Sequence, residues 1–501
     1  MDTLIKEVLN ARVYDVAVMT PLDTAEKLSA RLDNHVLLKR EDLQPCYSFK
    51  VRGAYNKIFH LTPREKAQGV ICASAGNHAQ GVALAAKHLS IAATIVMPVT
   101  TPRIKVDAVR ALGGEVVLSG DHFSEAYDHA CKLKGEAGAI FIHPFDDPLV
   151  IAGQGTIGHE LIQQCPDLDM VFVPVGGGGL IAGIAGFVKS LRPRVRIIGV
   201  EPEGSDAMRQ STQAGSRVNL DEVSLFADGV AVRQVGSLTF PLVQAHVDEI
   251  ITVTTDEICS ALKSIYEDTR SIVEPAGALA VAGLRRYVSA NAVRGQRIVA
   301  INSGANMNFD RLHFVAERAR TGEMREALFA VTIPEKPGAL RFFCEQLVEE
   351  RMITEFNYRL NGRSEAQIFV GISIRSGEER ESFRRKLEKH GYGNIDLTDN
   401  ELAKSHVRHM VGGKSLHRQN EVLYSFEFPE RPKALLDFLL AMEGSWNISL
   451  FHYRMHGGDF GRVLVGMEIP EADKGLFGAF LNKLQYHYQD ETDNPVYRLF
   501  L

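Results

Sequence analysis

The chain has 501 residues, of which 45% are hydrophobic and 24% are charged, the ordinary balance of a globular protein. At roughly 150 residues per domain, this length suggests about three domains. Lysine plus arginine total 56 and aspartate plus glutamate total 62, so the net charge is −6. No basic tail or patch is present, which argues against nucleic acid or an anionic membrane as the main partner. The most apolar stretches, such as 180–188, fall short of the roughly 20 residues of a membrane helix.

The cysteines and the N-terminus indicate where the protein works. The six cysteines are scattered without a CxxC pair, at Cys46, Cys72, Cys131, Cys165, Cys259 and Cys344. They form neither the pattern of a disulfide framework nor that of a zinc site, and we expect no metal site elsewhere. The first residues show no targeting peptide. Reduced thiols in a cytoplasmic protein are the simplest interpretation.

Short apolar runs rich in β-branched residues recur along the first 310 residues, separated by segments with helical spacing. The predicted strands are 70–73, 92–97, 115–118, 139–142, 170–175, 196–200 and 297–302. Pro102 opens one of the intervening helices, and Gly113 and Gly114 end it as C-cap glycines do. Continuous apolar strands separated by helices predict buried parallel sheets with helices on both faces.

After about residue 320 the chain repeats itself. The aligned segments are 328–340 with 423–435, 356–359 with 451–454, and 370–374 with 465–469, all at an offset of 95 residues. Three blocks in one register without a gap indicate a duplicated module. The alternative is a duplication that only adds mass or an oligomer contact.

Each copy of the repeat has the order strand, helix, strand, strand, helix, strand. This is the split βαβ arrangement of a ferredoxin-like fold. Pro337 and Pro432 stand where a proline opens the first helix of each copy. The charged, helix-compatible segment 311–325 would link the duplicated modules to the first part of the chain.

The segment Ser48-Phe49-Lys50-Val51-Arg52-Gly53 holds the first residue with a distinctive chemistry. A lone lysine is usually a solvated surface charge. Lys50, however, follows an aromatic residue and precedes a short run that enters a helix. A lysine in so tight a setting can have a depressed pKa and act as a Schiff-base nucleophile.

Two loops between a predicted strand and a predicted helix offer backbone N–H groups. Residues 74–81 form a turn of small residues that would bind an anion such as a carboxylate at a helix N-terminus, although an ordinary loop would look similar. The four glycines of 176–179 predict a nest of N–H groups for a phosphate.

The glycine segment has a second interpretation. Gly177, Gly179 and Ala182 satisfy a loose dinucleotide-binding pattern, and Glu201 ends the next strand at about the right distance for a ribose contact. A nicotinamide site would leave Lys50 and the loop 74–81 without a function, so we favour the phosphate interpretation.

Taken in this order, the three segments resemble the fold-type II family of pyridoxal-phosphate (PLP) enzymes, and within it the serine/threonine dehydratases. The C-terminal repeat is similar to the ACT-like regulatory domains of the biosynthetic threonine dehydratases. The resemblance covers nearly the whole chain. It implies an α/β fold with two open subdomains in a PLP-dependent catalytic domain over residues 1–320. Two ferredoxin-like (ACT-like) α+β regulatory modules would follow over 327–399 and 422–493.

The resemblance also implies a role for each matching residue. Lys50 would hold the cofactor, pyridoxal 5'-phosphate, as a Schiff base and take the Cα proton of the substrate as general base. Asn77 would contact the ring hydroxyl of the cofactor. Ser303 would face its pyridine nitrogen, although a serine after a strand also suits a helix N-cap. The cofactor phosphate would lie on the backbone N–H groups of Gly176, Gly177, Gly178, Gly179 and Leu180. The substrate carboxylate would lie on Ser74, Ala75, Gly76 and Asn77. Glu274 is either a further pocket residue or an acid at a helix start.

The expected reaction is β-elimination of L-threonine to 2-oxobutanoate and ammonia, the first step of isoleucine synthesis. The resemblance further implies a homotetramer that isoleucine inhibits and valine relieves. Within the same class, the alternatives are an L-serine dehydratase, a racemase or a β-replacement enzyme. In a different class, the chain would be an amino-acid-binding regulator with an inactive enzyme half, but the intact site residues argue against this.

Overall fold

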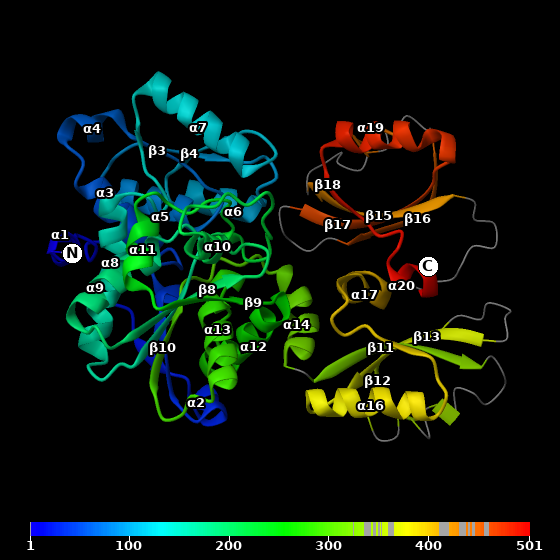
Figure 1. Cartoon of the computed structure of the whole chain (residues 1–501). Helices are drawn as coiled ribbons and strands as arrows, with labels where there is room; N and C mark the ends of the chain where they lie inside the picture. Colours follow the sequence, from blue (N-terminus) through cyan, green and yellow to red (C-terminus); the bar gives the residue numbers. More distant parts are fainter. Residues whose placement is uncertain are drawn as a thin grey trace. The chain divides into compact units, whose positions relative to one another are not determined.

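The computed structural model describes residues 2–323, 325–334, 342–343, 347–348, 351, 353–358, 365–409, 420–429, 437–438, 441–442, 446–454 and 460–500. The chain divides into two compact units, Met1–Ala319 and Arg320–Leu501 (Figure 1). None of the helices in the described ranges combines the length and the apolar character needed to cross a bilayer.

The larger sheet of the first unit has the strand order β1-β2-β10-β7-β8-β9. Its strands are β1 (Leu22–Thr24), β2 (His35–Arg40), β7 (Met170–Pro174), β8 (Arg196–Pro202), β9 (Glu249–Val253) and β10 (Arg297–Asn302). All neighbouring strands are parallel except β1 and β2. Every residue of β7 is buried, which is why this strand is a continuous apolar run in the sequence.

The smaller sheet of this unit has the order β5-β4-β3-β6 and is entirely parallel. Its strands are β3 (Val70–Ala73), β4 (Ala93–Met97), β5 (Glu115–Leu118) and β6 (Ile140–Phe141). The predicted strands 70–73, 115–118 and 297–302 coincide with β3, β5 and β10. The two parallel sheets confirm the predicted pair of open α/β subdomains.

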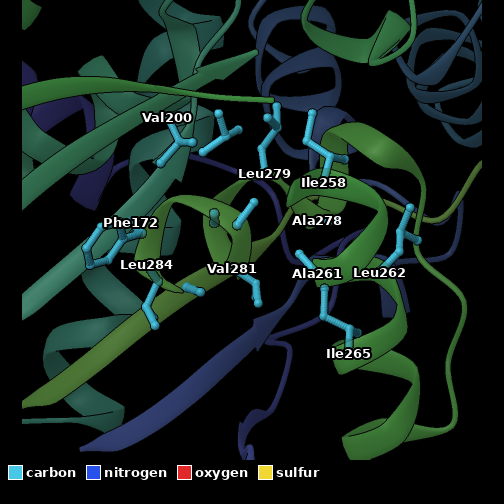
Figure 2. Close-up of a cluster of buried hydrophobic side chains, with 14 of the residues drawn as sticks. Phe172, Val200, Ile258, Ala261, Leu262, Ile265, Ala278, Leu279, Val281 and Leu284 are labelled. Carbon is cyan, nitrogen blue, oxygen red and sulfur yellow. The ribbon is translucent and has the colours of Figure 1, made fainter. Parts of the chain in front are cut away.

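Helices cover both faces of both sheets. They are α1 (Asp2–Leu9), α2 (Glu26–Leu32), α3 (Lys50–Phe59), α4 (Pro63–Gln68), α5 (Asn77–His88), α6 (Arg103–Ala111), α7 (Phe123–Ala137), α8 (Pro148–Gln164), α9 (Gly179–Leu191), α10 (Ala207–Ala214), α11 (Thr239–His246), α12 (Thr255–Thr269), α13 (Pro275–Asn291) and α14 (Arg311–Gly322), with the short 3-10 helices η1 (Glu41–Leu43) and η2 (Asp228–Val230). Figure 2 shows part of one core, where Phe172 and Val200 of the larger sheet meet Leu279 and Leu284 of α13. Successive strand residues point to opposite faces, so Val171 and Val173 join the core on the other side with α8 and α9.

Strand β2 lies outside the strands predicted from sequence. It ends in Lys39 and Arg40, which look like surface residues, yet both side chains are buried. Lys39 pairs with Glu160, and Arg40 pairs with Asp42. The strand can therefore lie in the interior, because its two positive charges are paired with carboxylates that lie outside the strand.

The second unit contains two modules with the same antiparallel topology. The first has β11 (Glu326–Pro334), β12 (Ile353–Tyr358), β13 (Glu365–Ser373), α16 (Gly377–Lys389) and β14 (Asn394–Asp396), with the order β12-β13-β11-β14. The second has β15 (Glu421–Pro429), β16 (Asn447–Arg454), β17 (Phe460–Glu468), η5 (Glu471–Asp473), α19 (Lys474–Leu484) and β18 (His487–Asp490), with the order β16-β17-β15-β18. These orders confirm the ferredoxin-like fold. Pro337 and Pro432 lie outside the described residues.

A fourth repeated block follows the last strand of each module. The sequence Asp-x-Thr-Asp-Asn occurs at 396–400 and at 490–494, an offset of 94 rather than 95, so a comparison at one fixed offset misses it. Thr398 Oγ1 accepts the N–H of Leu328 at 3.1 Å, and Thr492 Oγ1 accepts that of Leu423 at 3.1 Å. The block leads in one copy into α17 (Glu401–Ser405) and η4 (Val407–His409), and in the other into α20 (Pro495–Phe500).

The two modules share one hydrophobic core. Helices α17 and α20 supply Leu402, Val496 and Phe500 to a buried cluster that also contains Leu328 of the first sheet and Leu464 of the second. The ring of Phe369 in β13 packs edge-on against Phe500 at 5.9 Å. The modules therefore bury apolar area against each other and form one compact unit.

Candidate active site

One cavity in the first unit lies at the carboxyl ends of β7 and β10, the edge at which parallel α/β sheets bind ligands. Its lining residues are Phe49, Lys50, Asn77, Phe145, Pro174, Gly176, Gly177, Gly178, Gly179, Leu180, Gly229, Val230, Glu274, Ala276 and Ser303. They come from segments far apart in the sequence. The residues proposed to contact the cofactor all belong to this lining.

Backbone hydrogen bonds join the lysine segment to the end of β10. The N–H of Phe49 donates to the carbonyl of Ser303 at 3.2 Å, and Ala305 donates to Tyr47 at 2.9 Å. On the other side, a Cβ on Gly81 would lie only 3.1 Å from the carbonyl carbon of Lys50. Glycine at this position lets α5 pack closely against the start of α3. These contacts hold Lys50 beside Ser303 and Asn77.

The amine of Lys50, the first residue of α3, is set up as a nucleophile. Its Nζ donates to the carbonyl oxygen of Pro144 at 2.9 Å and lies 5.3 Å from the centroid of the Phe49 ring. Burial lowers the pKa of this amine to about 8, and the Coulomb attraction of Glu274 opposes the shift only partly. With this pKa, about one tenth of the amine is neutral at pH 7, and the neutral amine is the form that attacks a carbonyl carbon.

Asn77 is held at both ends of its carboxamide. Its Nδ2 donates to Glu274 Oε1 at 2.5 Å, and its Oδ1 accepts from Asn306 Nδ2 at 2.7 Å. These bonds orient the second N–H of Nδ2 relative to the cavity. Burial and the negative charge of Asp228 raise the pKa of Glu274 to about 7. Glu274 is the N-cap residue of α13 by position, but its side chain makes no cap hydrogen bond and binds Asn77 instead.

The glycine loop between β7 and α9 forms a cradle that side chains would fill. Gly178 has φ +94°, a left-handed conformation that glycine adopts without strain, and it caps the N-terminus of α9. The carbonyl of Gly177 accepts the Thr239 hydroxyl at 2.6 Å and the N–H of Gly236 at 3.2 Å. These bonds fix the peptide plane that carries the next N–H group. The loop thus has the form of an anion-binding nest at a helix N-terminus.

Ser303 directly follows β10 and is buried, with its Oγ donating to the carbonyl of Ala276 at 3.3 Å. The next helix, α14, begins eight positions later at Arg311. Ser303 is therefore not a helix N-cap, and its hydroxyl belongs to the cavity.

Ser74, Ala75 and Gly76 lie beside the cavity, outside its lining. They are half-buried and lead into α5, and the Ser74 hydroxyl accepts the N–H of Gly76 at 3.3 Å. His78 in the first turn of α5 bonds through Nε2 to the carbonyl of Ile142 at 2.8 Å. Burial lowers the pKa of His78 to about 3, so its imidazole is neutral. His78 therefore adds no charge at the N-terminus of α5, and a carboxylate there would be bound through backbone N–H groups.

Neither a dinucleotide site nor a metal site gains support from the structure. Both carboxylate oxygens of Glu201 accept backbone N–H groups at the start of α10, from Met208 and Arg209 at 2.9 Å each. They are buried there and do not face a ribose-binding groove. Within the described ranges, no three His, Cys, Asp or Glu side chains are placed to hold a metal ion.

Several residues of the site escaped the sequence analysis. Phe145 lines the cavity, Asn306 orients Asn77, and Thr239 orients the glycine loop. Asp146 accepts the N–H groups of Ser237 and Leu238 at 2.8 Å each, which ties the loop after β6 to the start of α11. These side chains stand in stretches without a distinctive motif, and only their neighbours in space give them a role.

The groups in the cavity fit pyridoxal phosphate. A partly neutral lysine can attack the aldehyde carbon of the cofactor. The N–H groups of the glycine loop can donate to its phosphate, and buried amide and hydroxyl groups can form hydrogen bonds with the polar atoms of its pyridine ring. At Gly177 a Cβ would overlap the Phe145 ring, and at Gly176 it would lie 2.9 Å from Val230 Cα, so the cradle requires glycines.

Comparison with known proteins finds a family match for each of the two units. Residues 13–304 match the family described as pyridoxal-phosphate dependent enzyme. Residues 317–407 and 412–501 each match the C-terminal regulatory domain of threonine dehydratase. The biosynthetic L-threonine dehydratase of Burkholderia multivorans is 55% identical, with 99% of each chain covered. That of Escherichia coli is 52% identical over 99% of this chain and 96% of its own.

Solved structures resemble the first unit. The processed form of threonine deaminase isoform 2 from Solanum lycopersicum is 52% identical, with a TM-score of 0.63 over 64% of this chain and 93% of that one. Maize serine racemase is 35% identical, with a TM-score of 0.59 over 62% of this chain and 96% of its own.

Proposed function

Because the chain belongs to the threonine dehydratase family of pyridoxal-phosphate dependent enzymes, we propose that it converts L-threonine to 2-oxobutanoate and ammonia, the first step of isoleucine synthesis. The observation that carries this proposal is the single cavity that Lys50, Asn77, the glycine loop (Gly176–Gly179) and Ser303 line together. The match to the Burkholderia enzyme extends over both units, which supports a regulated enzyme rather than a catalytic unit alone.

Different residues of the cavity have different roles in the proposed reaction. Pyridoxal phosphate, when bound, supplies the electron sink for the charge that develops at the substrate Cα. Lys50 would hold the cofactor, and its Nζ, once free, would take the Cα proton of the substrate. The electron pair of the broken Cα–H bond would form the Cα–Cβ double bond as the β-hydroxyl takes up a proton and leaves as water. The enamine product takes up water outside the site and yields 2-oxobutanoate and ammonia.

The remaining groups position the reactants. The glycine loop binds the phosphate through its N–H groups, and Asn77 contacts the ring hydroxyl. The Ser303 hydroxyl would face the ring nitrogen, and because it carries no charge it would favour direct elimination over a long-lived carbanion. Ser74, Ala75 and Gly76, at the N-terminus of α5, bind the substrate carboxylate.

We also propose that isoleucine inhibits the enzyme through the regulatory unit and that valine relieves the inhibition. The two matches to the regulatory domain of threonine dehydratase support an effector-binding role. The shared core between the modules allows an effector bound at one module to act on both. We further propose a homotetramer in the cytoplasm, where cysteines such as Cys46, Cys72, Cys131 and Cys165 remain reduced.

A visible spectrum of the purified protein tests the proposed function first. We expect an absorbance band from the lysine-bound cofactor and, after L-threonine is added, a 2-oxo acid whose formation isoleucine suppresses. A band without product from L-threonine would contradict the proposed substrate and direct the search to L-serine and β-replacement substrates. A protein that shows no band after incubation with pyridoxal phosphate would contradict the proposed cofactor.

Truncation after Gly322, the last residue of α14, is expected to leave an active enzyme that no longer responds to isoleucine. Residues 1–319 form a compact unit, and the tomato structure matches 64% of this chain with 93% of its own, which supports independent folding of that unit. The measurement is the rate of 2-oxobutanoate formation against isoleucine concentration for the truncated and full-length chains. Inhibition of the truncated chain with unchanged affinity would place the effector site in the first unit.

Thr239→Val is expected to weaken pyridoxal-phosphate binding roughly 2- to 10-fold, because it removes one hydrogen bond to the Gly177 carbonyl. The dissociation constant is measured from the visible absorbance during cofactor titration of the apoprotein. Thr212→Val is the matched control, since its hydroxyl donates to the Arg209 carbonyl within α10 at 2.8 Å. Equal affinities in the two variants would show that Thr239 does not orient the loop.

A further inference from the structure

The loop after β6 places the aromatic side chain of Phe145 in the lining of the cavity. Phe145 lies over the glycine loop, because a Cβ on Gly177 would overlap its ring. The residue is half-buried and belongs to the cavity lining. The ring therefore contacts the glycine loop, lines the cavity and is not fully buried.

Two contacts fix this ring in place. His143 packs edge-on against it, with ring centroids 4.7 Å apart. The Nδ1 atom of His143 accepts the N–H of Asp146 at 2.8 Å, which closes the turn around Phe145. Asp146 in turn binds the N–H groups of Ser237 and Leu238. Phe145 is therefore a rigid wall of the cavity and not a mobile side chain of a surface loop.

The position of Lys50 locates the substrate side chain relative to this wall. To take the Cα proton, Nζ must lie about 3–3.5 Å from the reacting atom. Nζ also lies 2.9 Å from the carbonyl oxygen of Pro144, the residue before Phe145. The substrate Cβ is one bond from Cα, so the side chain lies within reach of the Phe145 ring when the carboxylate points to the N-terminus of α5.

The other apolar side chains of the lining face different parts of the site. Phe49 packs against the core cluster under the larger sheet. Val230 is buried against Gly176, and Leu180 belongs to the anion-binding loop. Ala276 lies behind Ser303, whose hydroxyl donates to its carbonyl. Phe49 is also half-buried, with its ring centroid 5.3 Å from Lys50 Nζ. Phe145 differs from it because it lies over the glycine loop and directly follows Pro144, whose carbonyl accepts the hydrogen bond of Lys50 Nζ.

We propose that Phe145 packs against the γ-methyl group of threonine and sets the preference of the enzyme for L-threonine over L-serine. This inference rests on the proposed function. Threonine and serine share the amine, the carboxylate and the hydroxyl, so the methyl group is the only atom group by which the site distinguishes them. One methyl group in an apolar site changes kcat/KM by about 10- to 200-fold.

The test compares kcat/KM for L-threonine and L-serine in the full-length holoenzyme. Phe145→Ala is expected to lower the threonine-to-serine ratio at least about 10-fold, and Phe145→Leu less, since leucine keeps part of the apolar contact. Phe141→Leu is the matched control. Its ring lies 6.3 Å from that of His143 but outside the lining, and the ratio should stay at the wild-type value.

A second measurement separates recognition from catalysis. L-2-Aminobutyrate and L-alanine differ by the same methyl group and carry no β-hydroxyl to eliminate. Their dissociation constants, obtained from the change in the visible spectrum, should differ in the wild-type protein and converge in Phe145→Ala. If Phe145→Ala leaves the kcat/KM ratio and the ratio of dissociation constants unchanged and lowers the affinity for all four amino acids equally, Phe145 only supports the glycine loop and the inference is wrong. Failure of the wild-type protein to use L-threonine would instead overturn the proposed function.

Discussion

Lys50→Ala is expected to lower the turnover of L-threonine by at least about 10⁴-fold, the upper range for loss of a general base, because it also removes the covalent anchor of the cofactor. The variant should keep its fold, since the Lys50 amine forms one hydrogen bond to a backbone carbonyl and no ion pair among the described contacts. Turnover is measured as 2-oxobutanoate formation, and the fold by circular dichroism.

Lys57→Ala is a suitable control for this experiment, because Lys57 lies two turns further along α3 and pairs with Asp147 at 2.7 Å. It should retain most of the activity and the visible band of the cofactor. Sustained turnover in Lys50→Ala at more than about one hundredth of the wild-type rate would contradict the role of Lys50 as base and anchor.

Arg52→Leu is expected to lower the free energy of unfolding of the first unit by about 3–5 kcal/mol. The Arg52 guanidinium lies between two carboxylates, 2.8 Å from Glu41 and 2.6 Å from Glu160, and Lys39 pairs with Glu160 at 2.5 Å. All four side chains are completely buried, and two positive charges balance two negative ones. Removing Arg52 leaves two buried carboxylates facing a single lysine.

The stability loss is measured by urea unfolding, with Arg294→Leu as the control. The Arg294 side chain is 57% exposed and forms one ion pair with Asp33 at 3.7 Å, so its replacement should change stability by no more than about 0.5 kcal/mol. Equal stability of the two variants would mean that the buried carboxylates find other partners or take up protons at little cost. Because Arg52 lies two residues after Lys50 on α3, the network also anchors the helix that carries the nucleophile.

Local patterns in the sequence predicted much of the fold. Apolar runs located β3, β5 and β10 to the residue, because buried parallel strands need side chains that avoid water on both faces. The fixed offset of 95 residues revealed the duplicated module, since an internal repeat requires no knowledge of its fold. The glycine loop was recognisable because an anion nest at a helix start needs small residues in sequence.

Other features depended on contacts between residues distant along the chain. The comparison of the two repeats at a fixed offset of 95 residues missed the fourth block, because a single-residue deletion shifts its offset to 94. The strand prediction missed β2, whose Lys39 and Arg40 look like surface residues until their buried partners are known. Charged residues are buried only when paired, and a sequence pattern does not show the pairs.

By itself, the sequence determined most of the parallel strands, the repeat and the types of residue that could carry the chemistry. The tertiary structure alone decided how those residues meet. Asn77 binds Glu274 across 197 positions, and Arg52 binds Glu160 across 108. Phe145 stands over the glycine loop although no motif marks it. The physical reason is that strand and helix patterns arise from neighbouring residues, whereas a buried polar group or a cavity wall is defined by whichever distant side chains the packed sheets bring beside it.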